Sequence, residues 1–240
     1  VVAYMGTKTC VDRCANEADI TGASTYVGGV TGSVSQATSV LTNSCNLGDI
    51  KGTTNCAGVA GYNHKDAVIE NLFSLGEVAG NKIAACVGGT TAKNKAKNSF
   101  AITEYELAEG QTTVTAEQMA SGEVAYLLGE AFGQQIGTDA HPVLGADSVY
   151  KVTYTSTFSE EPDSLYANAR LPQLEIVEGH RPVWKTSADG EELAEIAADC
   201  TLFVDYRAIA VEGIALSQTE AILTEGDTLT LAATVTPDNA

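Results

Sequence analysis

The sequence predicts a mainly β protein that begins with a short β-solenoid of about four coils. Three observations predict this fold class. Short apolar segments bounded by glycine recur along the first hundred residues, and they recur at a nearly constant interval. After Gly110 the pattern changes, first to helical spacing and then to alternating strands. We therefore expect a solenoid with a helical cap, followed by further small β modules.

Two motifs form the repeat. The first reads VVAYMG (1–6), VGGVTG (27–32), CAGVAG (56–61) and AACVGG (84–89), and closes on Gly6, Gly32, Gly61 and Gly89. The second reads RCANEADITG (13–22), NSCNLGDIKG (43–52) and NLFSLGEVAG (71–80). One coil of strands cannot bury its own apolar face, but stacked coils join their faces into a continuous core. Each copy is therefore predicted to form one coil.

Superposing the copies predicts which side chains stack. Four apolar columns result: Tyr4, Val30, Val59 and Val87; Val11, Leu41, Ile69 and Ala96; Ala15, Cys45, Phe73 and Phe100; and Ile20, Ile50 and Val78. The acids Asp19, Asp49 and Glu77 are expected to face solvent, where charge discourages edge pairing. The glycines are expected where φ becomes positive or where a side chain would strike the next coil. The fourth copy degenerates after Phe100.

The segments YVGGVTG, CAGVAGY and CNLGDIKG resemble the GLUG-type repeats of bacterial cell-surface proteins. The resemblance covers about residues 1–105. It implies a β-solenoid that belongs to a secreted or surface-attached protein.

A helix is predicted from about Ala116 to Leu128. Thr115 and Gln118 have the spacing of a capping box, and apolar residues then follow at helical spacing. Because this helix follows the last coil directly, we expect it to cover the open end of the solenoid. The stretch MASGEVAYLLGEAFGQQIGTDAHPVL also resembles the segment that commonly follows GLUG repeats, which gives a first domain of about 1–148.

Two further modules are expected. KVTYTSTF, LEIVEGHRPVWKTSADG and TLFVDYRAI alternate as strands do, with a short helix or a turn around Glu191 to Ala198. Residues 149–209 resemble the Listeria–Bacteroides repeat of internalin B type, which implies a small β-grasp-like module. EGDTLTLAATVTP in residues 210–240 resembles the start of a bacterial immunoglobulin-like group 2 domain. Such a β-sandwich needs about 100 residues, so we expect an incomplete domain and a longer protein.

Charge limits the classes of partner. Thirteen Lys and Arg stand against 31 Asp and Glu, a net charge of −18, which repels nucleic-acid phosphates. No stretch approaches the roughly 20 apolar residues of a membrane-spanning helix. The first residues lack the pattern of a signal peptide, so any export signal is expected outside this chain.

The six cysteines, at positions 10, 14, 45, 56, 86 and 200, include no C-x-x-C pair and have no histidine at zinc spacing. We expect no metal site. Most of them occupy positions where neighbouring copies carry Ala, Val or Phe, so the sequence favours small buried side chains over disulfides.

No catalytic, cofactor-binding or metal-binding residue is assigned. Asp49 and Glu77 lack the arginine that a solenoid lyase would place beside its acids. His64 with Asp66 and His141 with Asp139 lie in turns without a nucleophile. Trp184, which follows His180 and Pro182, is expected in the core rather than on a sugar-binding surface. The turn SADGEE (187–192) lacks the ligand order of a calcium loop.

These observations favour a non-enzyme. The expected function is that of a structural or adhesive segment of a large secreted or cell-wall-attached bacterial surface protein, located outside the cell. Expected partners are a host or bacterial surface protein or glycan, together with neighbouring modules of the same polypeptide. The alternative is an accessory region of an exported peptidase or glycoside hydrolase whose catalytic domain lies outside this chain.

Overall fold

The computed structural model of the chain describes residues 2–88, 96–104, 107, 109–177 and 179–237. The chain divides into two compact units, Val1–Val149 and Tyr150–Ala240. This division falls beside the predicted boundary after residue 148. The predicted boundary between 149–209 and 210–240 lies inside the second unit.

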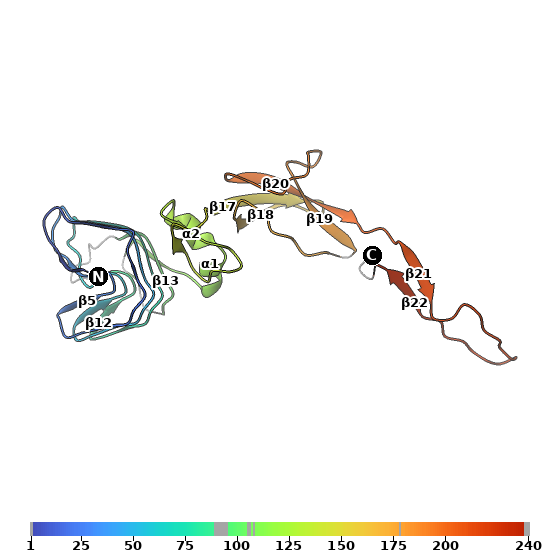
Figure 1. The fold of residues 1–240 in the computed structure, drawn as a ribbon, viewed down its shortest axis with the longest axis horizontal. Helices are drawn as coiled ribbons and strands as arrows, with labels where there is room; N and C mark the ends of the chain where they lie inside the picture. Colours follow the sequence, from blue (N-terminus) through green and yellow to red (C-terminus); the bar gives the residue numbers. More distant parts are fainter. Residues whose placement is uncertain (1, 89–95, 105–106, 108, 178, 238–240) are drawn as a thin grey trace. The chain divides into compact units, whose positions relative to one another are not determined.

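The first unit is a β-solenoid in which the chain winds repeatedly through four parallel sheets, here called sheets A to D (Figure 1). Sheet A contains β1 (Val2–Met5) and β6 (Thr31–Val34). Sheet B contains β2 (Cys10–Asp12), β3 (Ala15–Asn16), β7 (Val40–Asn46), β10 (Val68–Ser74), β13 (Lys97–Ala101) and β14 (Gln111–Thr113). Sheet C contains β4 (Ile20–Gly22), β8 (Ile50–Gly52) and β11 (Val78–Ala79). Sheet D contains β5 (Tyr26–Gly28), β9 (Asn55–Ala57) and β12 (Lys82–Ala84).

The solenoid makes about three turns rather than the four predicted, since sheets C and D have three strands each. Sheet B gains a further strand, β13, which pairs in parallel with β10. The chain then places β14 beside β13 in the same sheet, with Ser99 opposite Gln111, instead of going on to a new strand of sheet C. The fourth coil is therefore incomplete.

Backbone pairing confirms three of the predicted apolar columns: Val11, Leu41 and Ile69; Ala15, Cys45, Phe73 and Phe100; and Ile20, Ile50 and Val78. Ala96, predicted to continue the first of these, is fully buried just before β13. The acids beside the third column, Asp19, Asp49 and Glu77, are exposed as predicted.

The predicted column of Tyr4, Val30, Val59 and Val87 is wrong in register. Val30 does lie beside Val59, to whose carbonyl oxygen its amide donates at 3.0 Å. Tyr4, however, pairs with Ser33, and Val87 pairs with Ala60. Matching the first copy at its closing glycine fails because Gly6 is not the equivalent of Gly32, which lies beside Ala3 in the pairing of β1 with β6. Of those glycines, Gly89 lies outside the described residues.

Two apolar clusters fill the inside of the solenoid. The larger includes Met5, Val34, Leu41, Val59, Ile69 and Leu72. The smaller lies between sheets C and D and contains Val27, Ile50, Cys56 and Val78. Each cluster draws residues from successive coils, so the stack of coils, and not the single coil, is the unit that excludes water.

Residues other than glycine make the left-handed bends of sheet B: Arg13 in the first coil, with φ of 52°, and asparagine in the later coils. Asn43, Asn71 and Asn98 have φ angles of 48°, 58° and 49°. The glycines described in the coils up to residue 88 do not have positive φ and are needed for another reason. A Cβ on Gly76, for example, would lie 1.9 Å from the carbonyl oxygen of Gly48 in the previous coil. Of the two predicted reasons for the glycines, close approach is the one that applies in these coils.

Two short helices, α1 (Ala116–Ala120) and α2 (Glu123–Leu128), follow β14. The predicted capping box is present, because Thr115 and Gln118 exchange side-chain and backbone hydrogen bonds. The prediction of one continuous helix is wrong, because Gly122, with φ of 90°, separates α1 from α2. The small hairpin of β15 (Phe132–Gly133) and β16 (Val143–Leu144) completes the unit.

The helices were predicted to cover the open end of the solenoid. In the structure they pack instead against the outer side of sheet B. Cys45, Phe73 and Phe100, from three successive coils, cluster with Met119, Val124, Leu128 and Phe132. The rings of Phe73 and Phe132 meet edge to face with 5.5 Å between their centroids. A cap on the end would contact only the last coil.

The second unit contains a four-stranded sheet in the order β18-β17-β20-β19 (Figure 1). Its strands are β17 (Tyr150–Ser156), β18 (Ser159–Ala167), β19 (His180–Lys185) and β20 (Cys200–Ala208). β17 runs parallel to β20, and the other two pairs are antiparallel. The region 191–198, predicted as a short helix or a turn, is irregular. Its backbone forms isolated antiparallel β-bridges between Glu192 and Lys185 and between Glu195 and Arg170.

A second, antiparallel pair of strands in this unit joins β21 (Gly213–Leu216) to β22 (Ala233–Thr236). Its apolar side chains are largely exposed: Ile214 is 66% and Leu216 49% accessible. Across the described part of the chain, no helix has the length and apolar character needed to cross a membrane.

Candidate functional site

The exposed acids of sheet C form a hydrogen-bonded ladder along the solenoid. Asp19 Oδ1 accepts from the backbone amide of Asp49 at 2.9 Å, and Asp49 Oδ1 accepts from the amide of Glu77, also at 2.9 Å. Asp19 and Asp49 therefore each bond their coil to the next through a carboxylate oxygen.

A second ladder, of amide side chains, follows the left-handed bend of sheet B. Asn43 Nδ2 donates to Asp12 Oδ1 at 2.7 Å, Asn71 Nδ2 to Asn43 Oδ1 at 2.9 Å, and Asn98 Nδ2 to Asn71 Oδ1 at 2.8 Å. Asn98 Nδ2 also donates to the carbonyl oxygen of Leu127 at 2.6 Å, which joins the ladder to α2. This ladder was not predicted from the sequence, although Asn43 and Asn71 are the first residues of two copies of the second motif.

A third, buried ladder lies inside the coils. Asn16 Nδ2 donates to Asn46 Oδ1 at 2.7 Å, and Asn46 Nδ2 donates to the Ser74 hydroxyl at 3.4 Å. The same amide nitrogens also donate to the carbonyl oxygens of Ala18 and Gly48, at 2.7 and 2.6 Å. Buried polar groups are costly unless paired, and these pairings also bind adjacent coils together.

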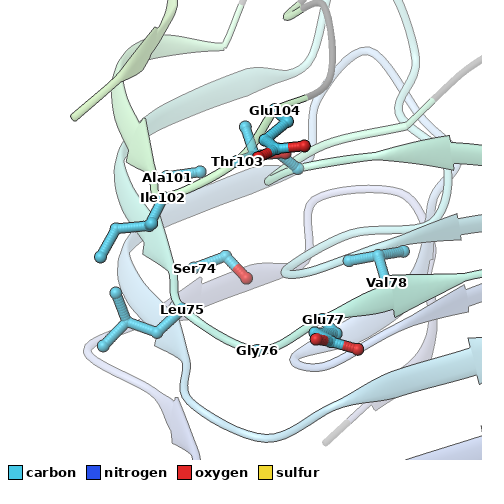
Figure 2. Close-up of a pocket in the computed structure, with 10 residues that line it drawn as sticks. Ser74, Leu75, Gly76, Glu77, Val78, Ala101, Ile102, Thr103 and Glu104 are labelled. Atoms are coloured by element: carbon cyan, nitrogen blue, oxygen red, sulfur yellow. The ribbon is translucent and has the colours of Figure 1, made fainter. Parts of the chain in front are cut away.

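The buried ladder ends at a hollow of about 290 Å³ beside β11, the last strand of sheet C. Residues 74–78, Ala85 and 101–104 line it. Figure 2 shows Glu77 and Glu104 on opposite sides of the hollow, with Ser74 between them in this view. The hollow lies where a complete fourth coil would have continued sheet C, so it is a consequence of the early end of the solenoid.

The chemistry of this end hollow is limited. Ser74 is 2% exposed and accepts from Asn46, and no histidine or arginine lines the hollow. A serine needs a neighbouring base to act as a nucleophile, and the residues that line the hollow include no histidine to serve Ser74 in that way.

The histidine–aspartate pairs weighed from the sequence lie in turns. His64 Nδ1 accepts from the backbone amide of Asp66 at 3.2 Å, which closes its own turn. Asp139 Oδ2 accepts from the amide of Gln135 at 2.7 Å, while His141 Nδ1 lies 2.8 Å from the carbonyl oxygen of Pro142. Their hydrogen bonds stabilise local backbone.

All six cysteines are free thiols in the structure. Cys45, Cys56 and Cys86 are buried, as the repeat predicts, whereas Cys10 is exposed. Burial raises the pKa of both Cys45 and Cys86 to about 12. Burial therefore disfavours the thiolate, which is the reactive form of cysteine, at both positions.

In the second unit, Trp184 belongs to the core as predicted. It is 7% exposed, and its Nε1 donates to the carbonyl oxygen of Pro172 at 2.8 Å. Of the acids in the turn 187–192, Glu192 forms an ion pair with Arg207, which also bonds to Asp205 of β20. The Arg207 guanidinium is the main reason that the pKa of Asp205 is lowered.

Among the described residues, no group of three or more His, Cys, Asp or Glu side chains is placed to hold a metal ion. The chain was also compared with models of protein families, with curated proteins and with solved structures, and none of them matches it.

Proposed function

We propose that this chain is a non-catalytic structural or adhesive segment of a large secreted or cell-wall-attached bacterial surface protein. In this role the solenoid is a stiff scaffold that spaces neighbouring modules and docks ligands on its outer surface. The ligands we propose are a host or bacterial surface protein or a glycan.

The use of polar side chains in the repeat carries this proposal. The acid ladder, the asparagine ladder and the buried amide ladder all bond one coil to the next. Side-chain networks of this kind, added to parallel strand pairing, stiffen a stack of coils. In this repeat the polar side chains of the three ladders form hydrogen bonds between adjacent coils. Such a repeat is suited to a rigid scaffold and is poorly suited to catalysis.

The proposed relationships of the modules follow the same reasoning. Residues 1–148 would be a GLUG-type domain in which α1 and α2 brace the side of sheet B. Residues 149–209 would be a Listeria–Bacteroides repeat-like, β-grasp-like module, which the mixed sheet order with β17 beside β20 supports. Residues 210–240 would begin an immunoglobulin-like group 2 domain, to which the pairing of β21 with β22 is suited.

The experiment uses the full 240-residue chain. The fluorescently labelled chain is applied to panels of immobilised glycans, to bacterial cells and to host matrix proteins, with the heat-unfolded chain as control. In parallel, the unlabelled chain is incubated with polysaccharides and with casein, and new reducing ends and free amines are measured. Saturable binding by the folded chain without turnover supports the proposal. Turnover by this chain overturns it, as does the absence of saturable binding on every surface.

A further inference from the structure

A pocket in the second unit combines apolar walls with two arginines. It has a volume of about 440 Å³, and residues of β19 form part of its lining. Its apolar walls include Leu171, Pro172, Leu174, Pro182, Trp184 and Leu193, and its two cationic residues are Arg170 and Arg181. Pockets of roughly 300 to 1,000 Å³ with mostly apolar walls and a few polar groups are typical of small-molecule sites.

The pocket walls are fixed by hydrogen bonds that join three segments of the chain. Trp184 Nε1 donates to the carbonyl oxygen of Pro172 at 2.8 Å. The backbone amide of Leu193 donates to the carbonyl oxygen of Trp184 at 2.9 Å. The backbone amide of Leu171 donates to the carbonyl oxygen of Ala194, also at 2.9 Å. A pocket that is already formed costs a ligand little reorganisation.

The cations of this unit are distributed unequally. From Tyr150 onward the sequence has five: Lys151, Arg170, Arg181, Lys185 and Arg207. Lys185 pairs with Asp205, and Arg207 pairs with Asp205 and Glu192. In the described part of the chain, no ion pair is formed by Arg170 or Arg181. Three of the five cations, Lys151, Arg170 and Arg181, are thus left without an ion pair among the described residues. Two of these three, the arginines, line this pocket.

We propose that this pocket binds a small carboxylate carried on an apolar ring. The planar guanidinium group matches a carboxylate in geometry and charge, and it remains charged at any ordinary pH. The ring lies against the apolar wall formed by Trp184, Pro182 and Leu171, where burial of apolar surface is favourable. The overall charge of −18 repels anions elsewhere on the surface, so the two arginines also decide where such a ligand is held.

The single tryptophan of the chain provides a local reporter for this proposal. The ¹⁵N-labelled full chain is titrated with 2-naphthoate, and with 2-naphthylmethanol as the uncharged probe of the same shape. The signal followed is the indole N–H resonance of Trp184. The variants are Arg170→Gln, Arg181→Gln and the double variant. Lys151→Gln is the matched control, since it removes an equal charge outside the pocket.

The expected result is a saturable shift of the indole resonance with naphthoate and weaker binding of the alcohol. Each arginine substitution should weaken naphthoate binding about threefold and the double variant about tenfold, with Lys151→Gln unchanged. Binding should weaken as salt is added. The proposal is overturned if naphthoate leaves the resonance in place, if the alcohol binds equally well, or if a folded double variant, judged by its unchanged amide spectrum, binds as the wild type does.

Discussion

Asn71 donates its side-chain amide to the side-chain oxygen of Asn43 at 2.9 Å, and both residues have left-handed backbone with φ of 58° and 48°. Asparagine tolerates this conformation better than most residues with a side chain. The short amide reaches the identical amide one coil away, because the coils stack in register. In the coils after the first, where Arg13 holds the equivalent bend, asparagine thus provides both the bend and a bond between coils.

Replacing Asn71 separates these two contributions. Asn71→Gly keeps the backbone freedom but removes both ladder bonds, and should lower the free energy of unfolding by about 1–2 kcal/mol. Asn71→Ala adds the strain of a Cβ at positive φ, about 1 kcal/mol more. Denaturant unfolding of the first unit measures both variants. Lys8→Gly is the control, since Lys8 has φ of 58° outside this ladder. Equal losses for the glycine and alanine variants would contradict the role given to the bend.

Gly76 tests the close approach of coils. A Cβ there would lie 1.9 Å from the carbonyl oxygen of Gly48, which is backbone and cannot rotate away. Gly76→Ala should therefore lower the free energy of unfolding by about 2–3 kcal/mol. Gly6→Ala is the matched control, because its Cβ would meet only the Tyr4 ring at an ordinary 3.5 Å, and should change stability by less than about 0.5 kcal/mol. Chemical denaturation compares them, and similar losses would rule out inter-coil contact as the reason for Gly76.

Phe73 tests the side packing of the helices. Phe73→Ala removes the ring that meets Phe132 and should destabilise the unit by about 3–5 kcal/mol. Hydrogen exchange should show α2 amides losing more protection than those of β10. Leu72→Ala, one residue earlier, is the control, because Leu72 belongs to the interior cluster of the solenoid. If α2 exchange were unaffected by Phe73→Ala, the helices would not depend on the middle coil.

The parts of the fold that repeat could be predicted from the sequence. A position that points inward in one coil points inward in the next, so Cys45, Phe73 and Phe100 leave a visible column. Register at the N-terminal end could not be predicted as well, because Tyr4 was placed by matching Gly6 to Gly32, whereas the pairing of β1 with β6 places Gly32 beside Ala3. The interruption of the helix was not predicted, because the apolar residues keep helical spacing across Gly122. Only the left-handed backbone of Gly122 in the structure shows that the helix is divided there.

The candidate sites were harder to predict than the fold. The end hollow lies beside the last strand of sheet C because β14, the next described strand after β13, joins sheet B, and no residue type in the sequence predicts this. The pocket of the second unit joins Arg170 and Arg181 to Leu193, and irregular segments bring these residues together. Trp184 was correctly predicted as a core residue from its rarity and size, yet its place in a pocket wall depends on tertiary packing alone.

The buried thiols predict how stability depends on alkaline pH. Burial raises the pKa of Cys86 from 9.0 to about 12 in the folded chain, whereas the unfolded chain exposes an ordinary thiol. Between these two values the unfolded state releases a proton that the folded state retains, so unfolding becomes more favourable as pH rises. The stabilising contribution is complete below pH 9 and is lost progressively toward pH 12, at up to about 1.4 kcal/mol per pH unit for one thiol.

Cys86→Ala isolates this contribution from the titration of lysine and tyrosine. The variant loses packing at every pH, so it should be less stable than the wild type at pH 8. The difference in free energy of unfolding should narrow steadily as pH is raised from 9 toward 11, because only the wild type is destabilised by the Cys86 thiol. Ala85→Gly is the control, since Ala85 is buried in the same cluster as Cys86 and carries no titratable group, and its difference from the wild type should stay constant. Urea unfolding at each pH measures these differences, and a constant gap for Cys86→Ala would show that the thiol is not shielded from water in solution.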